Sequence, residues 1–368
     1  MFKNVDIVTQ LRKEQNFLSR LNSVRFFVIF IMMFGYASTM SLGPGHQESL
    51  ALYGYDPSWH AIQVLFFLSG ILAYRSIENG KTGFTYLWSR FSRNIPLLGF
   101  LTIAILFILF PLFGTPNDSG TDFWKRITKY ILLTAFCIDP SMRIQGLMDD
   151  AKYMCLVQGA IWTLRIGIIL HIAVVISHFA KLFSKRILIL AGTITVTIGY
   201  ALLGYLFAKK GIETLESVLT LLRLSYAFGI GLCVWAYRDF LLNLKARIFI
   251  LPVIFFLIAS LNFWFFRWTT LIEVSSTMVF ISLSWALLVT RHRYLDLLKD
   301  WKNVTMIMMA IGWPITQTLL LIHPDLGRWT LPLVALPTIV ALTYITHWSL
   351  QKSAEFSATR RFVLARTS

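Results

Sequence analysis

The sequence predicts an all-α fold, a polytopic membrane bundle of about ten transmembrane helices. Apolar residues make up 56% and charged residues 14% of the 368 residues, against roughly 45–50% and about 25% in soluble domains. The apolar residues gather in runs of about 20, which is the length that crosses a bilayer as a helix. Lys and Arg lie in short clusters between these runs, as is typical of membrane proteins with many spans.

Ten apolar segments are expected to span the membrane. In chain order they are residues 24–42, 59–77, 95–113, 160–180, 187–207, 218–237, 248–266, 271–290, 304–323 and 329–349. A further apolar piece, Tyr130–Ile138, is too short to span and is expected to be re-entrant or interfacial. The segment 114–159 that contains it is the largest connection and is expected to cap the bundle from outside.

Three regions follow from this division. Residues 1–23 form a cytoplasmic or interfacial segment, 24–350 the membrane domain and 351–368 a basic cytoplasmic tail. The first region carries scattered apolar residues among charges and is expected to lie at the interface as an amphipathic helix. Because the first long apolar run begins behind this polar segment, no cleavable signal peptide is expected.

The distribution of basic residues predicts the orientation. Of the 34 Lys and Arg residues, 23 fall on the side that holds both termini, counting Arg25 with the N-terminal segment, and 9 fall on the other side. The positive-inside rule therefore predicts cytoplasmic termini. The net charge of +16 does not predict nucleic-acid binding, because a basic nucleic-acid binder carries its charge on a water-soluble face.

Cysteine and histidine spacing predicts no metal site. Cys137 and Cys155 either pair outside the membrane or remain ordinary thiols, and Cys233 stands alone. His171 and His178 are two helical turns apart on one face but have no carboxylate nearby in the sequence.

Ionisable residues inside the spans are functional candidates by default, because they are costly in a bilayer. Arg25 opens the first span and is either a site residue or an anchor at the headgroups. Arg165 is expected to face the bundle interior and find an anion or a carbonyl. Glu273 is expected to pair with Arg267 across a short turn, and Arg223 to extend outward toward the headgroups.

Two further features follow the second span. Ser69 and Gly70 permit two helices to approach closely. Arg90 and Arg93 are three residues apart and share one helix face. A pair of guanidinium groups at a cytoplasmic membrane edge suits either phosphate recognition or contact with lipid headgroups.

Four of these segments, in this order, resemble the motifs of the acyltransferase-3 family of polytopic membrane O-acyltransferases. They are Leu21-Asn22-Ser23-Val24-Arg25, Phe66-Phe67-Leu68-Ser69-Gly70, Arg90-Phe91-Ser92-Arg93-Asn94-Ile95-Pro96 and Trp162-Thr163-Leu164-Arg165-Ile166-Gly167. A weaker likeness, at Ala354-Glu355-Phe356, lies near the end of the chain. The resemblance covers nearly the whole chain and agrees with ten helices.

The resemblance implies transfer of an acyl group, most often acetyl, from acyl-CoA (acetyl-CoA) on the cytoplasmic side. The acceptor is a hydroxyl of a cell-envelope carbohydrate or glycolipid, such as lipopolysaccharide or another envelope polysaccharide. Membrane lipid is the other expected partner, and a bacterial inner membrane the expected location. Arg90 and Arg93 are expected to hold the donor phosphates, and Ser69, Trp162 and Arg165 to line the substrate cavity.

The sequence departs from the family at two positions. Tyr36 stands where the family has a His beyond the first-helix Arg, and Gly167 stands where it has a Glu. Arg25, Tyr36 and His60 are the expected catalytic residues, since a Tyr donates hydrogen bonds although it is a poor base at neutral pH.

Three interpretations of these departures stay open. The catalytic group has moved to His46 or His60 beside the second helix, or the motif register is displaced by a helical turn. Alternatively, the protein is a degenerate relative that acts without turnover as a binding, carrier or flippase-like component of polysaccharide biosynthesis or export.

Overall fold

The computed structural model describes residues 2–48, 50–51, 55–114, 120–139, 142–210, 216–243, 250–266, 268–289 and 303–367. Of these, the backbone alone is described at residues 2–16, 18–19, 93, 120–123, 208–210, 243, 266 and 353–367. Within these ranges the chain is helical, with one isolated antiparallel bridge between Gly114 and Leu147. The all-α prediction is confirmed.

Nine of the described helices are long and apolar enough to cross a membrane. They are α1 (Phe2–Met40), α2 (Pro57–Glu78), α3 (Gly83–Phe113), α5 (Thr163–Phe179) with the preceding 3₁₀ turn η1 (Gly159–Trp162), α6 (Arg186–Lys210), α7 (Glu216–Ala236), α10 (Thr269–Val289), α11 (Val304–Ile322) and α12 (Thr330–Thr367). The shorter elements are α4 (Gly120–Ala135), η2 (Leu182–Ser184), α8 (Arg238–Asn243), α9 (Ile250–Leu261) and the π-helical turn η5 (Asn262–Phe266).

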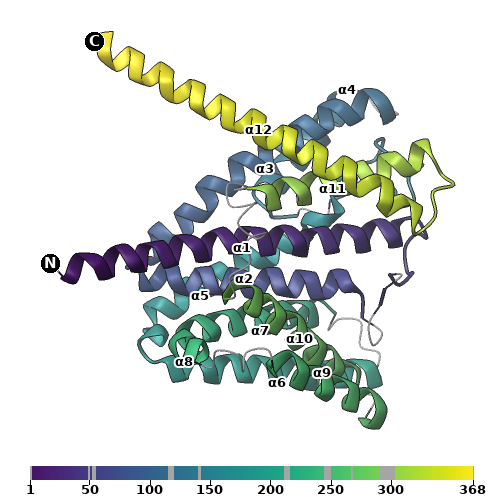
Figure 1. Cartoon of the computed structure of the whole chain (residues 1–368). Helices are drawn as coiled ribbons and strands as arrows, with labels where there is room; N and C mark the ends of the chain where they lie inside the picture. Colours follow the sequence, from purple (N-terminus) through teal and green to yellow (C-terminus); the bar gives the residue numbers. More distant parts are fainter. Residues whose placement is uncertain are drawn as a thin grey trace.

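The expected span at residues 248–266 corresponds to α9 and η5, which together form a shorter apolar helix. Both termini project from the same end of the bundle (Figure 1). Nine passes would leave them at opposite ends, and the shorter apolar helix formed by α9 and η5 is the described segment that fits a tenth pass. The apolar piece Tyr130–Ile138 falls at the end of α4 and the turn after it, and the preceding part of α4 carries Asp122, Lys125, Arg126 and Lys129, so α4 is not an apolar helix.

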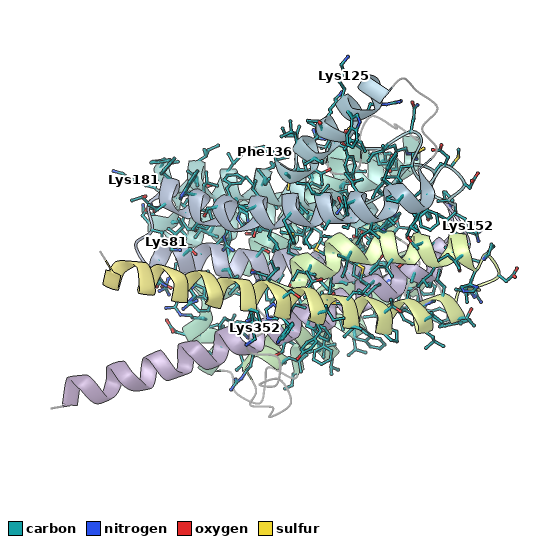
Figure 2. The ribbon with its side chains drawn as sticks, turned by 90° about the horizontal axis from the view of Figure 1, so that it is seen from above. Lys81, Lys125, Phe136, Lys152, Lys181 and Lys352 are labelled. Atoms are coloured by element: carbon teal, nitrogen blue, oxygen red, sulfur yellow. The ribbon has the colours of Figure 1, made fainter. Side chains whose placement is uncertain are left out.

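The N-terminal segment is not a separate element, because α1 runs without interruption over 39 residues. Figure 1 shows α1 crossing the middle of the molecule, with α11 and α12 on one side and α2 and α7 on the other. It packs against α2, α10, α11 and α12. Lys81 and Lys181 lie at the end from which the termini project, and Lys152 lies at the opposite end (Figure 2).

Two glycines allow α2 and α7 to pack closely. A methyl group on Gly70 would collide with the carbonyl oxygen of Phe228, and one on Gly231 with the carbonyl oxygen of Phe67. Each helix therefore seats its glycine on the backbone of the other, as small residues do in membrane helix pairs. The close approach predicted at Gly70 is confirmed.

A buried polar network ties α2, α6, α7 and α10 together. Glu273 is fully buried, and its Oε1 lies 2.8 Å from Arg223 Nε. The same oxygen accepts a hydrogen bond of 2.6 Å from Gln63 Nε2, and the Tyr200 hydroxyl donates to Oε2. The prediction that Arg223 extends outward is wrong, because a carboxylate in the low-dielectric interior holds it inward. Arg267, the partner expected for Glu273, lies outside the described residues.

Candidate functional site

Two cavities lie on opposite faces of the first turns of α5. One has a volume of about 390 Å³ and the other about 780 Å³, both within the usual range for small-molecule sites. Trp162, Arg165, Ile166 and Ile169 line the larger cavity, whereas Thr163, Leu164, Gly167, Ile168 and His171 line the smaller one. This alternation follows the helical period, so one stretch of chain forms a wall of both cavities.

The smaller cavity is called here the arginine cavity. Besides the residues of α5, its polar lining consists of Asn22, Arg25, Ser69, Arg90, Asn94, Asn303 and Thr305. Two guanidinium groups with several amides match the chemistry of a ligand that carries phosphates. The guanidinium of Arg90 also lies 5.5 Å from the centre of the Tyr86 ring. The Tyr86 hydroxyl in turn lies 2.6 Å from Nδ1 of His171.

The larger cavity, called here the aromatic cavity, is lined by five aromatic side chains, Tyr36, Trp59, Tyr153, Trp162 and Trp313. They meet edge to face: the ring centres are 5.6 Å apart for Trp59 and Trp162, 5.6 Å for Tyr36 and Trp313, and 5.1 Å for Tyr153 and Trp313. Aromatic faces beside polar groups suit a ligand that has apolar faces and hydroxyl edges.

Glu48 is the buried acid of the aromatic cavity. Its side chain lies in the connection between α1 and α2 and is 6% exposed. Its Oε2 accepts a hydrogen bond of 3.0 Å from the backbone N–H of Ser58, and its own N–H donates to Asp56 Oδ1 at 2.9 Å. The carboxylate sits against Gly35, where a methyl group would collide with it.

The surroundings of Glu48 favour its protonated form. Burial raises the pKa of Glu48 to about 7, the hydrogen bonds from Ser58 act to lower the pKa, and the negative charge of Asp56 raises it further. A carboxyl group with a pKa near neutrality, facing a cavity, is a candidate proton acceptor. Glu48 was not among the residues predicted from the sequence.

The predicted site residues divide between the two cavities. Arg25, Ser69 and Arg90 line the arginine cavity, although the Ser69 hydroxyl also donates to the Leu65 carbonyl oxygen at 2.9 Å. Tyr36 lines the aromatic cavity. Arg25 and Tyr36 are about 16 Å apart along α1, at 1.5 Å per residue, and face different cavities. The side chain of Arg93 lies outside the described part of the structure.

The fourth motif forms the shared wall. Trp162 and Arg165 line the aromatic cavity, and the Arg165 side chain is exposed. Gly167 lines the arginine cavity, and a methyl group on it would find no heavy atom within 4 Å. The position of the family's Glu therefore borders open space beside the two arginines.

His60 lines neither cavity. Its ring is fully buried, with Nδ1 3.0 Å from the Thr277 hydroxyl and Nε2 3.4 Å from the Ser276 hydroxyl, and it stacks on Phe280. His46, the other histidine considered, is exposed and lines the aromatic cavity, with Nδ1 3.3 Å from the Gly43 carbonyl oxygen.

The His, Cys, Asp and Glu side chains were compared for metal-binding groups and disulfides in the part of the chain that the structure describes. It contains no group of three or more His, Cys, Asp or Glu side chains placed to hold a metal ion. Cys137, Cys155 and Cys233 are free thiols, so the disulfide considered for the first two is not formed. The Cys155 thiol instead donates to Asp149 Oδ1 at 3.0 Å.

Three comparisons with known proteins found no match. No family model, no curated protein and no solved structure matches it. The likeness to the acyltransferase-3 family therefore depends on the four motifs and on where they lie. Far apart in the sequence, they all border the two cavities: the first three line the arginine cavity, and the fourth separates it from the aromatic cavity.

Proposed function

We propose that the protein is an integral membrane O-acyltransferase. It moves an acyl group, most simply acetyl, from acyl-CoA to a hydroxyl of a cell-envelope carbohydrate or glycolipid. The observation that carries the proposal is the pair of cavities, one cationic and one aromatic, that share a wall of α5. A transfer between two unlike substrates needs two adjoining sites of unlike chemistry, and this arrangement supplies them.

The arginine cavity is the donor site in this proposal. CoA carries several phosphate charges, and Arg25 and Arg90 offer guanidinium groups for charge-assisted hydrogen bonds to them. The cavity involves Asn22 of α1 and Asn303 at the start of α11, toward the end of the bundle where the basic connections and both termini lie. The positive-inside rule makes this end cytoplasmic, where acyl-CoA is found.

The aromatic cavity is the acceptor site. Its ring faces offer stacking surfaces for the C–H faces of a sugar, and its carboxylates offer hydrogen-bond acceptors for sugar hydroxyls. Its volume of about 780 Å³ is in the upper part of the range for small-molecule sites. The acyl group crosses from one site to the other at the level of Trp162 and Thr163, where the two linings adjoin.

A second candidate function is binding or carriage without turnover. The open space beside Gly167 favours it, because the family's carboxylate is absent from the donor side of the wall. Such a protein would bind acyl-CoA in the arginine cavity and label no acceptor.

Acetyl transfer by the purified protein in nanodiscs tests the proposal. The substrates are radiolabelled acetyl-CoA and a crude envelope glycan extract. We expect label in the glycan from the wild type, and at least a tenfold loss of transfer and of acetyl-CoA affinity in Arg90→Ala. Lys81→Ala, which removes an exposed cation at the same end of the bundle, is the matched control and should transfer at the wild-type rate. Acetyl-CoA binding without any labelled glycan would contradict the proposal and favour the second candidate.

A further inference from the structure

Acyl transfer to a sugar hydroxyl needs a proton acceptor, because a neutral hydroxyl is a weak nucleophile. The position where the family resemblance places a His holds Tyr36, and a phenol is a poor base at neutral pH. The proton must therefore go to another group that faces the acceptor site.

The aromatic cavity offers few such groups. Its titratable and charged lining, taken over every element that borders it, consists of Tyr36, His46, Glu48, Asp56, Tyr153, Arg165 and Glu216. An arginine and two phenols do not accept protons at neutral pH. His46 and Glu216 are exposed, and among the described residues the one hydrogen-bond contact found for either side chain is the 3.3 Å contact from His46 Nδ1 to the Gly43 carbonyl oxygen.

Glu48 differs from the remaining acid, Asp56, in burial and in anchoring. Glu48 is buried, whereas Asp56 is half-buried and accepts the backbone N–H of Glu48 through Oδ1. The Glu48 carboxylate is fixed from two sides, by the hydrogen bond from Ser58 and by its seat on Gly35 of α1. A catalytic group held by packing and hydrogen bonds in one geometry is the arrangement that efficient proton transfer requires.

We infer that Glu48 is the general base of the transfer, the group that accepts the proton of the acceptor hydroxyl in the aromatic cavity. This inference rests on the proposed acyl transfer and names a residue for it outside the four motifs. A pKa of about 7 for Glu48 agrees with the role, since a base is most effective when its pKa lies near the operating pH.

The step balances without a further reactant. The hydroxyl oxygen forms a bond to the thioester carbonyl carbon while its proton passes to the Glu48 carboxylate. The carbon–sulfur bond then breaks, and the electron pair leaves with the sulfur. The thiolate takes up the proton released by Glu48, so the products are an ester and the free thiol of CoA, and Glu48 returns to its starting state.

Glu48→Gln tests the inference at the residue itself. The amide oxygen of Gln still accepts the Ser58 N–H, so the fold at the start of α2 is kept. We expect kcat for acetyl transfer to fall by about 100-fold or more, with acetyl-CoA affinity unchanged. The rise of kcat/KM across pH 6 to 8 should be lost. Asp325→Asn, an exposed acid in the connection between α11 and α12, is the control and should keep both the rate and the pH profile.

A chemical rescue distinguishes two roles of Glu48: a general base, and a side chain that only accepts the Ser58 N–H at the start of α2. In Glu48→Ala, added formate should restore part of the rate, because a small carboxylate can occupy the vacated space on Gly35. A Glu48→Gln rate within threefold of the wild type, or a Glu48→Ala variant that formate does not rescue, would overturn the assignment. If the wild type itself labels no glycan while it binds acetyl-CoA, the proposed acyl transfer fails and the role of Glu48 fails with it.

Discussion

The guanidinium group of Arg223 lies 4.5 Å from the centre of the Trp59 ring. Trp59 lines the aromatic cavity, and Arg223 forms an ion pair with Glu273. The buried network therefore ends in a cation beneath one of the rings on which an acceptor would stack, in the geometry of a cation–π contact. The ion pair between α7 and α10 therefore supports a side chain, Trp59, that lines the aromatic cavity.

Breaking this pair from one side should destabilise the protein. Glu273→Leu leaves Arg223 buried without its carboxylate, and we expect a loss of about 3–5 kcal/mol in the free energy of unfolding. In the double variant Arg223→Met with Glu273→Leu, much of that loss should be recovered, because no uncompensated charge remains. Denaturant unfolding of the protein in micelles measures both. Equal stability of the single and double variants would contradict this account.

The contact between α2 and α7 should be sensitive to a single methyl group. Gly70→Ala places that group against the carbonyl oxygen of Phe228, and forcing the two helices apart should cost about 1–3 kcal/mol. Gly192→Ala on α6, where a methyl group meets nothing within 4 Å, is the matched control. It should be neutral or slightly stabilising, since Ala is the better helix former. Thermal unfolding midpoints of the two variants compare them directly.

The space beside Gly167 allows the electrostatics of the arginine cavity to be tested. Gly167→Glu adds a negative charge to a cavity that holds Arg25 and Arg90, whereas Gly167→Gln adds a side chain of similar size without the charge. If the cavity binds a phosphate-bearing donor, acetyl-CoA should bind at least tenfold more weakly to the Glu variant than to the Gln variant, and the difference should shrink at high salt. Equal affinities would mean that the donor binds elsewhere.

The buried carboxyl group of Glu48 should make the free energy of unfolding depend on pH. The pKa of Glu48 is about 7 in the folded protein and near its ordinary value of 4.5 in the unfolded chain. Between these two values the folded state binds more protons than the unfolded state, so stability falls as the pH rises through this window and is constant above it.

We therefore expect the wild type to lose more stability than Glu48→Gln between pH 5 and pH 7. The cost is about 1.4 kcal/mol for each unit of pKa difference. The difference between their unfolding midpoints, followed across this pH range, measures the effect. Parallel curves for the two proteins would show that Glu48 is ionised as easily in the fold as outside it.

The positions of the helices could be predicted from the sequence because a bilayer imposes a length on every apolar run. The expected span at 59–77 is α2, Pro57–Glu78, and the expected span at 160–180 is η1 and α5, Gly159–Phe179. The expected span at 248–266 forms a short helix and a π-helical turn. Residues from three of the four motifs, distant in the chain, line the arginine cavity together.

The partners of buried charges could not be predicted, because they are set by which helices become neighbours. Arg267 is six residues from Glu273 in sequence, whereas Arg223 is brought to Glu273 because α7 and α10 both pack against α2 and α6. Glu48 was missed for a related reason. An acidic residue in a connection between spans is expected to be exposed to solvent. The burial of Glu48 follows from its contact with Gly35 and its hydrogen bond from Ser58, which the sequence does not reveal.

Like α5, the helix α1 supplies residues to both cavities, Arg25 to one and Tyr36 to the other. If the two cavities bind donor and acceptor as proposed, a shift of α1 on donor binding that alters the aromatic cavity would couple the two affinities. By thermodynamic reciprocity, the acceptor would then change the affinity for the donor by the same factor.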